Sequence, residues 1–165
     1  MRCMLLHLLL VAALYGQSTL SVYGRDVAGK DPGVLLFAIA NAYAENNGLR
    51  PTEEEIAPLR KKLGPLDAKH QRGAMDFAYN IVLLSKLNQK WWASYGGKVV
   101  LSAFGMHLAT DAMLREVESL EKSGRLKFHD AEVRRNFIGH YQRYRGDGVI
   151  EGEKVKQLFA EGLAK

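Results

Sequence analysis

The residues best suited to acid–base or metal chemistry lie near the start of a predicted C-terminal helix: His129, Asp130, Glu132 and His140. Zinc and similar ions need three or four ligands that converge on one point. A helix rises about 1.5 Å per residue, so His140 lies several turns from His129 and the two cannot share an ion without an outside ligand. Asp130 is better explained as the N-cap of that helix. We therefore expect no metal site here and no cofactor in the chain.

Three consecutive glutamates, Glu53, Glu54 and Glu55, form a second acidic group. Successive helix residues point about 100° apart, so these carboxylates cannot meet at one substrate atom. With Thr52 they instead form a capping box at the start of a helix. The sequence also lacks a glycine-rich phosphate loop and a G-x-S-x-G nucleophile elbow, and its only cysteine, Cys3, lies at the N-terminus. These observations disfavour an enzyme.

The aromatic residues favour binding over catalysis. Five of them lie in a predicted helix from Ala74 to Tyr95, where Trp91 and Trp92 are adjacent and therefore point about 100° apart. One indole can face the core while the other meets solvent or a second element. Two interpretations stay open: the pair bridges two packed helices, or the aromatic cluster borders an apolar groove for a peptide. The candidate peptide-binding residues are Tyr43, Phe77, Trp91, Trp92 and Tyr95.

Helical periodicity places these side chains on a mostly α-helical scaffold. Apolar residues recur every three or four positions in six segments, and glycine or asparagine ends most of them. Asp31 and Asp130 are expected N-caps, and either Thr110 or Asp111 caps the fourth helix. The predicted helices cover approximately residues 32–46, 52–63, 74–95, 111–122, 131–144 and 153–163.

Two short segments have the pattern of strands. Lys98–Phe104 is rich in β-branched residues between glycines, and Arg125–His129 alternates polar and apolar residues. We expect the two to pair as one ribbon, and Tyr23–Gly33 to form a loop or short strand. The predicted fold class is mostly α, with about six helices and one short two-stranded β-ribbon.

Residues 1–24 have the features of a secretory signal peptide. Arg2 supplies the positive start, and Met4–Leu14 is an apolar run too short to span a bilayer comfortably. The tolerable last residues before a cleavage are Ser18, Ser21 and Gly24. A buried N-terminal helix of the fold is the alternative. We expect cleavage near residues 18–24, a single helical domain over residues 25–165, and a periplasmic or secreted location.

The formal charge of +5 includes a locally basic C-terminal third with Arg134, Arg135, Arg143 and Arg145. Acidic residues interleave with these arginines, so a solvated helix face explains them, and phosphate or lipid binding is the alternative. Contact with a membrane surface therefore stays open. The basic residues form no stripe with stacking aromatics, which argues against nucleic acid as a partner.

The segment YAENNGLRPTEEEI combines a helix end of the form Y-A-x-x-x-G-h with the corner P-T-x-x-E-I. This pattern resembles the N-terminal helical module of SurA-like periplasmic chaperones and related parvulin-type isomerases. The matching positions are Tyr43, Ala44, Gly48, Leu49, Thr52, Glu55 and Ile56. The later stretches WWASYGGKVVLSAFG and GRLKFHD are similar to bacterial secreted proteins that share this first half, so the resemblance touches most of residues 22–130.

The resemblance implies a secreted, non-enzymatic helical protein that holds unfolded or extended polypeptide. The residues after 130 are too few and too helical for a parvulin domain, so prolyl isomerase activity is not implied. The family module works with a C-terminal helix that packs back on it, and Glu153–Leu163 is the segment for that role. The alternative is an envelope interaction or structural protein with one dedicated folded partner.

Overall fold

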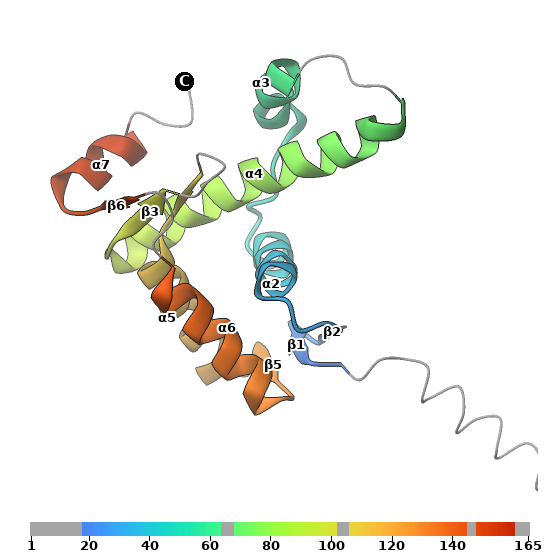
Figure 1. Cartoon of the computed structure of the whole chain (residues 1–165), viewed down its shortest axis with the longest axis vertical. Coiled ribbons are helices and arrows are strands. Elements are labelled where there is room, and N and C mark those ends of the chain that lie inside the picture. Colours follow the sequence, from blue (N-terminus) through green and yellow to red (C-terminus); the bar gives the residue numbers. More distant parts are fainter. Residues whose placement is uncertain (1–17, 64–67, 102–105, 145–147, 161–165) are drawn as a thin grey trace, which may run out of the picture.

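The computed structural model describes residues 18–63, 68–101, 106–144 and 148–160, without the side chains of residues 68–75 and 160. This part of the chain is mostly helical, as predicted, and contains six helices (Figure 1). The longest is α4, Ala68–Tyr95, whose 28 residues span about 42 Å at the usual helical rise. The others are α2 (Pro32–Asn46), α3 (Glu53–Leu63), α5 (Thr110–Lys122), α6 (Ala131–Arg143) and α7 (Glu153–Ala160).

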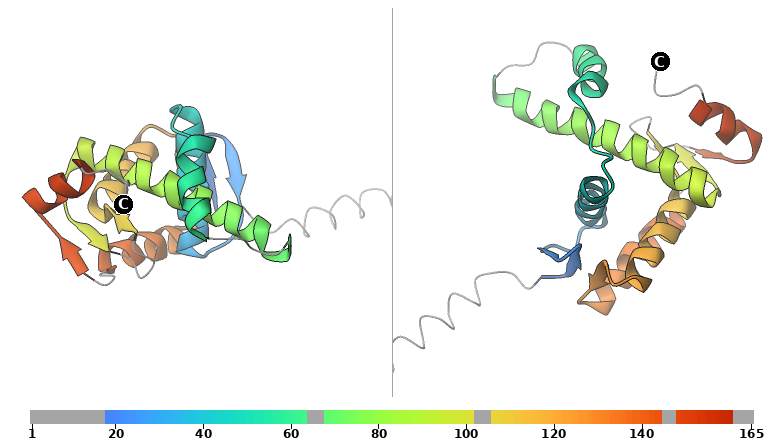
Figure 2. Two further views of the ribbon diagram at one scale, coloured as in Figure 1. Left: turned by 90° about the horizontal axis from the view of Figure 1, so that it is seen from above. Right: turned by 180° about the vertical axis from the view of Figure 1, so that it is seen from behind.

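Helix α4 crosses the molecule and carries two separate packing regions (Figures 1 and 2). Its C-terminal half packs on α2 and α5, and its Leu83, Leu87 and Trp91 are fully buried in the main core. Helix α3 packs on the N-terminal half through a smaller cluster centred on Ile56 and Val82. Because the two clusters use different sides of α4, they leave a strip of this helix between them.

A first antiparallel sheet packs against α2, α5 and α6. Its strand order is β2–β1–β5. The strands are β1 (Leu20–Val22), β2 (Arg25–Val27) and β5 (Leu126–Phe128). Tyr23 and Gly24 join β1 to β2 with φ angles of 47° and 77°, as a two-residue hairpin turn of type I′ requires. Leu20 and Val22 are buried. The folded domain therefore includes β1, whereas the predicted domain begins at residue 25.

A second antiparallel sheet has the strand order β4–β3–β6. Its strands are β3 (Val99–Leu101), β4 (His107–Leu108) and β6 (Gly148–Ile150). The predicted ribbon between residues 98–104 and 125–129 is therefore wrong, because β3 and β5 lie in different sheets. The reason is that β5 pairs with β1, a segment that the predicted leader had removed from the fold. Residues 102–104 of the predicted strand lie outside the described residues.

Three of the predicted helix starts are confirmed by their hydrogen bonds. The Asp31 carboxylate accepts from the backbone N–H of Val34 at 2.9 Å, and the Asp130 carboxylate accepts from the N–H of Glu132 at 2.8 Å. The Glu55 carboxylate reaches back to the N–H of Thr52 at 2.8 Å, the reciprocal half of a capping box. Helix α4 starts at residue 68, six residues earlier than predicted.

The predicted N-cap of α5, Thr110 or Asp111, is wrong. The N-cap residue is Ala109, whose side chain cannot accept a hydrogen bond. The buried side chain of Asn88 on α4 instead binds the backbone of Ala109: its Oδ1 accepts from the Ala109 N–H at 2.7 Å, and its Nδ2 donates to the Leu84 carbonyl at 2.7 Å. Asp111 instead accepts from the backbone N–H of Lys98 at 3.2 Å. One side chain therefore fixes the start of α5 against α4.

We expect Asn88→Ala to lower the free energy of unfolding by about 2 kcal/mol, because it leaves the buried Ala109 N–H without an acceptor. Urea denaturation monitored by circular dichroism measures this change. The matched control is Asn136→Ala on the exposed face of α6, which should have little effect. Equal effects of the two substitutions would contradict the role given to Asn88.

Candidate functional site

Two of the five predicted peptide-binding side chains belong to the hydrophobic core. Trp91 is 1% exposed and Tyr43 is 7% exposed. Their rings meet edge to face with centroids 5.6 Å apart, a favourable arrangement for an aromatic pair. Burial raises the pKa of the Tyr43 hydroxyl, and the charge of Glu116 adds to this effect. These two aromatic residues hold α2 against α4 and present no surface to a ligand.

Tyr95, a third predicted residue, fastens α4 to α5. Its hydroxyl donates to Glu116 Oε2 at 2.9 Å, and its backbone carbonyl accepts from the Arg115 guanidinium at 3.0 Å. Burial raises the pKa of the Tyr95 hydroxyl, and the hydrogen bond to Glu116 raises it further. Tyr95 is half-buried, so its main role is to join the two helices.

Trp92 points away from the core, unlike its neighbour Trp91. Its indole N–H donates to the Gly97 carbonyl at 3.0 Å, which fixes the orientation of the ring. The ring packs on Phe159 of α7 with centroids 5.5 Å apart. Trp92 is only partly covered by these contacts. Trp92 therefore bridges α4 and α7, as the packing interpretation predicts, while the peptide-groove interpretation stays a prediction.

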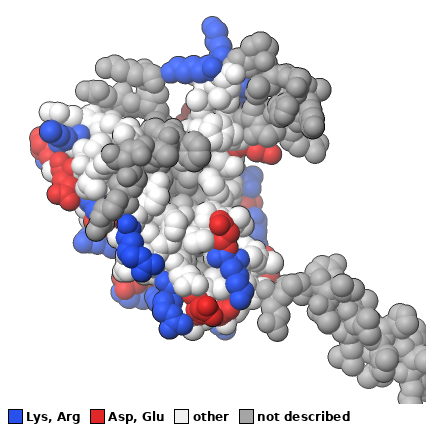
Figure 3. Space-filling view, in the orientation of Figure 1, with Lys and Arg blue, Asp and Glu red and all other residues white. Residues whose placement is uncertain are grey.

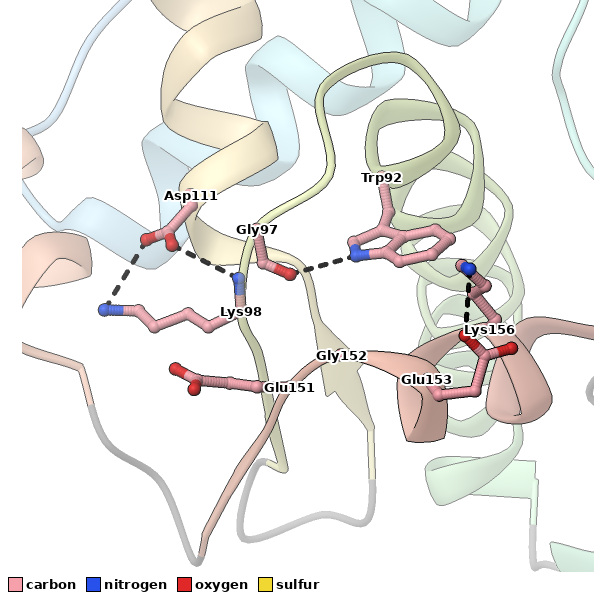
Figure 4. A pocket seen from close by; sticks show the side chains of 8 residues that line it. All are labelled: Trp92, Gly97, Lys98, Asp111, Glu151, Gly152, Glu153 and Lys156. Atoms are coloured by element: carbon pink, nitrogen blue, oxygen red, sulfur yellow. Dashed lines mark hydrogen bonds and ion pairs between the residues drawn. The ribbon is translucent and has the colours of Figure 1, made fainter.

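The accessible side of Trp92 forms a wall of an open pocket of about 520 Å³ (Figure 4). The pocket lies where the C-terminal end of α4, the start of β3, the start of α5 and the β6–α7 connection come together. Gly97 is required there: its φ is 99°, and a Cβ atom would lie 2.8 Å from the Asp111 Cβ. The lining residues are Trp92, Gly97, Lys98, Asp111, Glu151, Gly152, Glu153 and Lys156.

The charges in the pocket are partly paired. Lys98 Nζ lies 3.5 Å from Asp111 Oδ1, and Lys156 Nζ lies 2.8 Å from Glu153 Oε2. Glu151 comes directly after β6, and Lys98 comes directly before β3. Because these strands are antiparallel neighbours, both residues lie at the same end of the second sheet. The two lysines and three carboxylates give the lining a formal charge of −1, whereas the whole chain carries +5. The pocket is therefore locally acidic in a basic protein.

Phe77, the fifth predicted residue, lies near the other end of α4 and is 40% exposed. With about 100° between successive helix residues, Phe77, Ile81, Ser85 and Trp92 fall within about 80° of one another. Ile81, Ser85 and Trp92 are all partly exposed. These four residues, named here the α4 flank, occupy the strip between the α3 contact and the main core. Phe77 and Trp92 are separated by about 22 Å along the helix axis.

The periodicity of the sequence does not separate the α4 flank from the buried face of the same helix. Spacing alone would place Phe77 and Ile81 on one stripe with Leu84 and Trp91, because intervals of four, three and seven residues separate them. In the structure Leu84 and Trp91 are buried, while Phe77 and Ile81 lie at the edge of the stripe. Apart from Trp92, the pocket residues were missed because they come from four segments that only the fold brings together.

The other candidate groups are accounted for by local contacts. His129 Nε2 lies 3.8 Å from Asp26 Oδ1, and the His140 ring packs on Tyr141 at 4.8 Å. Within the described ranges, no three histidine, cysteine or acidic side chains are grouped so as to hold a metal ion. Arg134 is engaged by Glu121 in two hydrogen bonds of 2.7 and 2.9 Å. Arg145 lies outside the described residues.

The visible surface carries both signs of charge. Lysine and arginine side chains alternate with acidic ones across the main body (Figure 3), as expected for a solvated surface. None of the helices in the described part has the length and apolar character that crossing a bilayer would require.

Comparison with known proteins gave no relatives: no family model, curated protein or solved structure matches this chain.

Iodide quenching of tryptophan fluorescence should distinguish the two indoles. We expect Trp92→Phe to reduce the quenching constant severalfold, because the remaining Trp91 is enclosed in the core. The complementary Trp91→Phe variant, if folded by circular dichroism, should keep most of the wild-type quenching. Strong quenching of the Trp92→Phe protein would contradict the burial of Trp91.

Proposed function

We propose that this protein is a non-enzymatic, chaperone-like module of the bacterial envelope that binds unfolded or extended polypeptide. The observation that carries the proposal is the α4 flank, on which Phe77, Ile81 and Trp92 stay accessible between two packed regions. Exposed apolar residues in such an arrangement are typical of an interaction surface. The resemblance of residues 43–56 to the N-terminal helical module of SurA-like chaperones is a further argument for the same function.

The length of the flank suits a short extended segment. A strand advances about 3.3 Å per residue, so the separation of about 22 Å between Phe77 and Trp92 corresponds to roughly seven residues of client. Apolar side chains at the two ends of such a segment would contact the two aromatic rings. The contact area is small, and ordering the client costs free energy, so we expect weak and reversible binding.

The second candidate function is interaction with one dedicated folded partner. The specific observation in its favour is the pocket beside Trp92, where lysines and carboxylates are held in defined pairs. Such a fixed polar arrangement favours one complementary surface over many different clients. Purification of the tagged full chain from its native envelope distinguishes the two functions: one stoichiometric partner supports the second, and many substoichiometric proteins support the first.

Suppression of the aggregation of a chemically denatured client tests the first function. We expect Phe77→Ser to reduce the protection measurably, since loss of one buried aromatic contact costs about 1.5 kcal/mol, or tenfold in affinity. Light scattering at several-fold molar excess of the protein measures the protection. Trp92→Ala should give a similar loss.

The control for this experiment is Val34→Ser, which removes an apolar side chain that is 53% exposed on α2, away from the flank. It should leave the protection unchanged. The proposal is wrong if the wild-type protein gives no protection, or if Val34→Ser and Phe77→Ser are equally harmful.

The acidic pocket predicts a preference for clients with basic residues. Of two peptides with the same apolar centre, the one flanked by arginine should bind more tightly than the one flanked by glutamate, and added salt should reduce the difference. Glu151→Gln should weaken the preference, whereas Glu118→Gln, an exposed neutralisation on α5, should not. Fluorescence anisotropy of labelled peptides measures both effects, and equal binding of the two peptides would contradict this preference.

A further inference from the structure

Thr19 directly precedes β1 and is already part of the fold. Thr19 is only 7% exposed, and its backbone N–H donates to the Val27 carbonyl at 2.9 Å. Its hydroxyl donates to the Gly29 carbonyl at 2.6 Å, and its own carbonyl accepts from the His129 N–H at 2.9 Å. Thr19 thus connects the strand β2, the loop that follows it, and the end of β5.

The next residues are equally integrated. Leu20 is completely buried and Val22 is 1% exposed, and β1 is the central strand of its sheet. Cleavage after Ser21 would remove Leu20 and Ser21, so β2 and β5 would lose most of β1, the strand with which both of them pair. Cleavage after Gly24 would remove the whole strand together with the hairpin turn. Neither product could close this sheet or fill the core beneath it.

Ser18 has a different environment. It is partly exposed, and its hydroxyl is hydrogen-bonded to the Leu20 carbonyl at 2.9 Å and to Asp26 Oδ1 on β2 at 3.1 Å. In the sequence Gly16 stands two residues before it, so the last and the third-last positions before a cut at this point are both small. Of the tolerable cleavage points, Ser18 alone combines this pattern with a complete β1.

We propose that the Ser18–Thr19 peptide bond is the processing site of this chain, and that the mature protein begins at Thr19. The cleavage is a hydrolysis by an envelope leader peptidase. Water adds to the Ser18 carbonyl carbon, the C–N bond breaks, Ser18 leaves with a carboxylate, and Thr19 keeps an ammonium group. That ammonium can still donate to the Val27 carbonyl. This inference rests on the predicted leader and is independent of polypeptide binding.

The test is the intact mass and N-terminal sequence of the protein recovered from the envelope or medium of a bacterial host that expresses the full chain. A product beginning at Thr19 is expected. A product beginning at Val22 or Arg25, one beginning before Thr19, or an uncleaved chain overturns the proposal.

Two matched substitutions make the position unambiguous. Gly16→Tyr places a large residue at the third-last position before the proposed cut and leaves the last and third-last residues of the competing cuts unchanged, so precursor should accumulate or the cut should move. Ser21→Tyr changes the last residue before the competing cut. It should leave the yield of processing unchanged and the mature N-terminus at Thr19. Blocked processing in the Ser21→Tyr chain, with normal processing in the Gly16→Tyr chain, would place the cut after Ser21 and overturn the proposal.

Discussion

The burial of one side of α4 in the main core is the constraint on which the rest of the structure depends. Leu83, Leu87 and Trp91 lie against α2 and α5, and Asn88 ties the same face of α4 to the start of α5 by a buried hydrogen bond. The Asn88 side chain is buried, and both its carbonyl and its NH₂ group are hydrogen-bonded. Such an amide specifies one arrangement of α4 and α5, because a shift of either helix would leave a buried polar atom without a partner. The rotation of α4 about its own axis is therefore fixed.

This fixed rotation determines what the protein can present to a partner. With Trp91 in the core, Trp92 must point about 100° away, toward α7 and the pocket. With α3 held on its own side of α4 by Ile56 and by the 2.8 Å ion pair between Glu55 and Lys86, Phe77 is left at the border. The accessible aromatic residues Phe77 and Trp92, separated along α4, are a consequence of packing, and they support the proposed polypeptide binding.

Sequence patterns predicted the local features of this fold well and its long-range pairings poorly. Helix existence and the caps at Asp31 and Asp130 depend on residues close together in the chain, so periodicity and side-chain chemistry were sufficient. The partner of β5 and the acceptor for Ala109 come from distant segments, which no local pattern encodes. The five aromatic candidates failed as a single site for the same reason, since the exposure of each depends on which other helix packs over it.

The central claim is that polypeptide contacts the α4 flank, and site-specific photo-crosslinking tests it most directly. A benzoylphenylalanine introduced at Ile81, between the two aromatic ends of the flank, should crosslink to a denatured client in proportion to its concentration. The same group at Arg135, exposed on α6, should crosslink far less. Equal crosslinking at the two positions, or none at Ile81, would contradict the account.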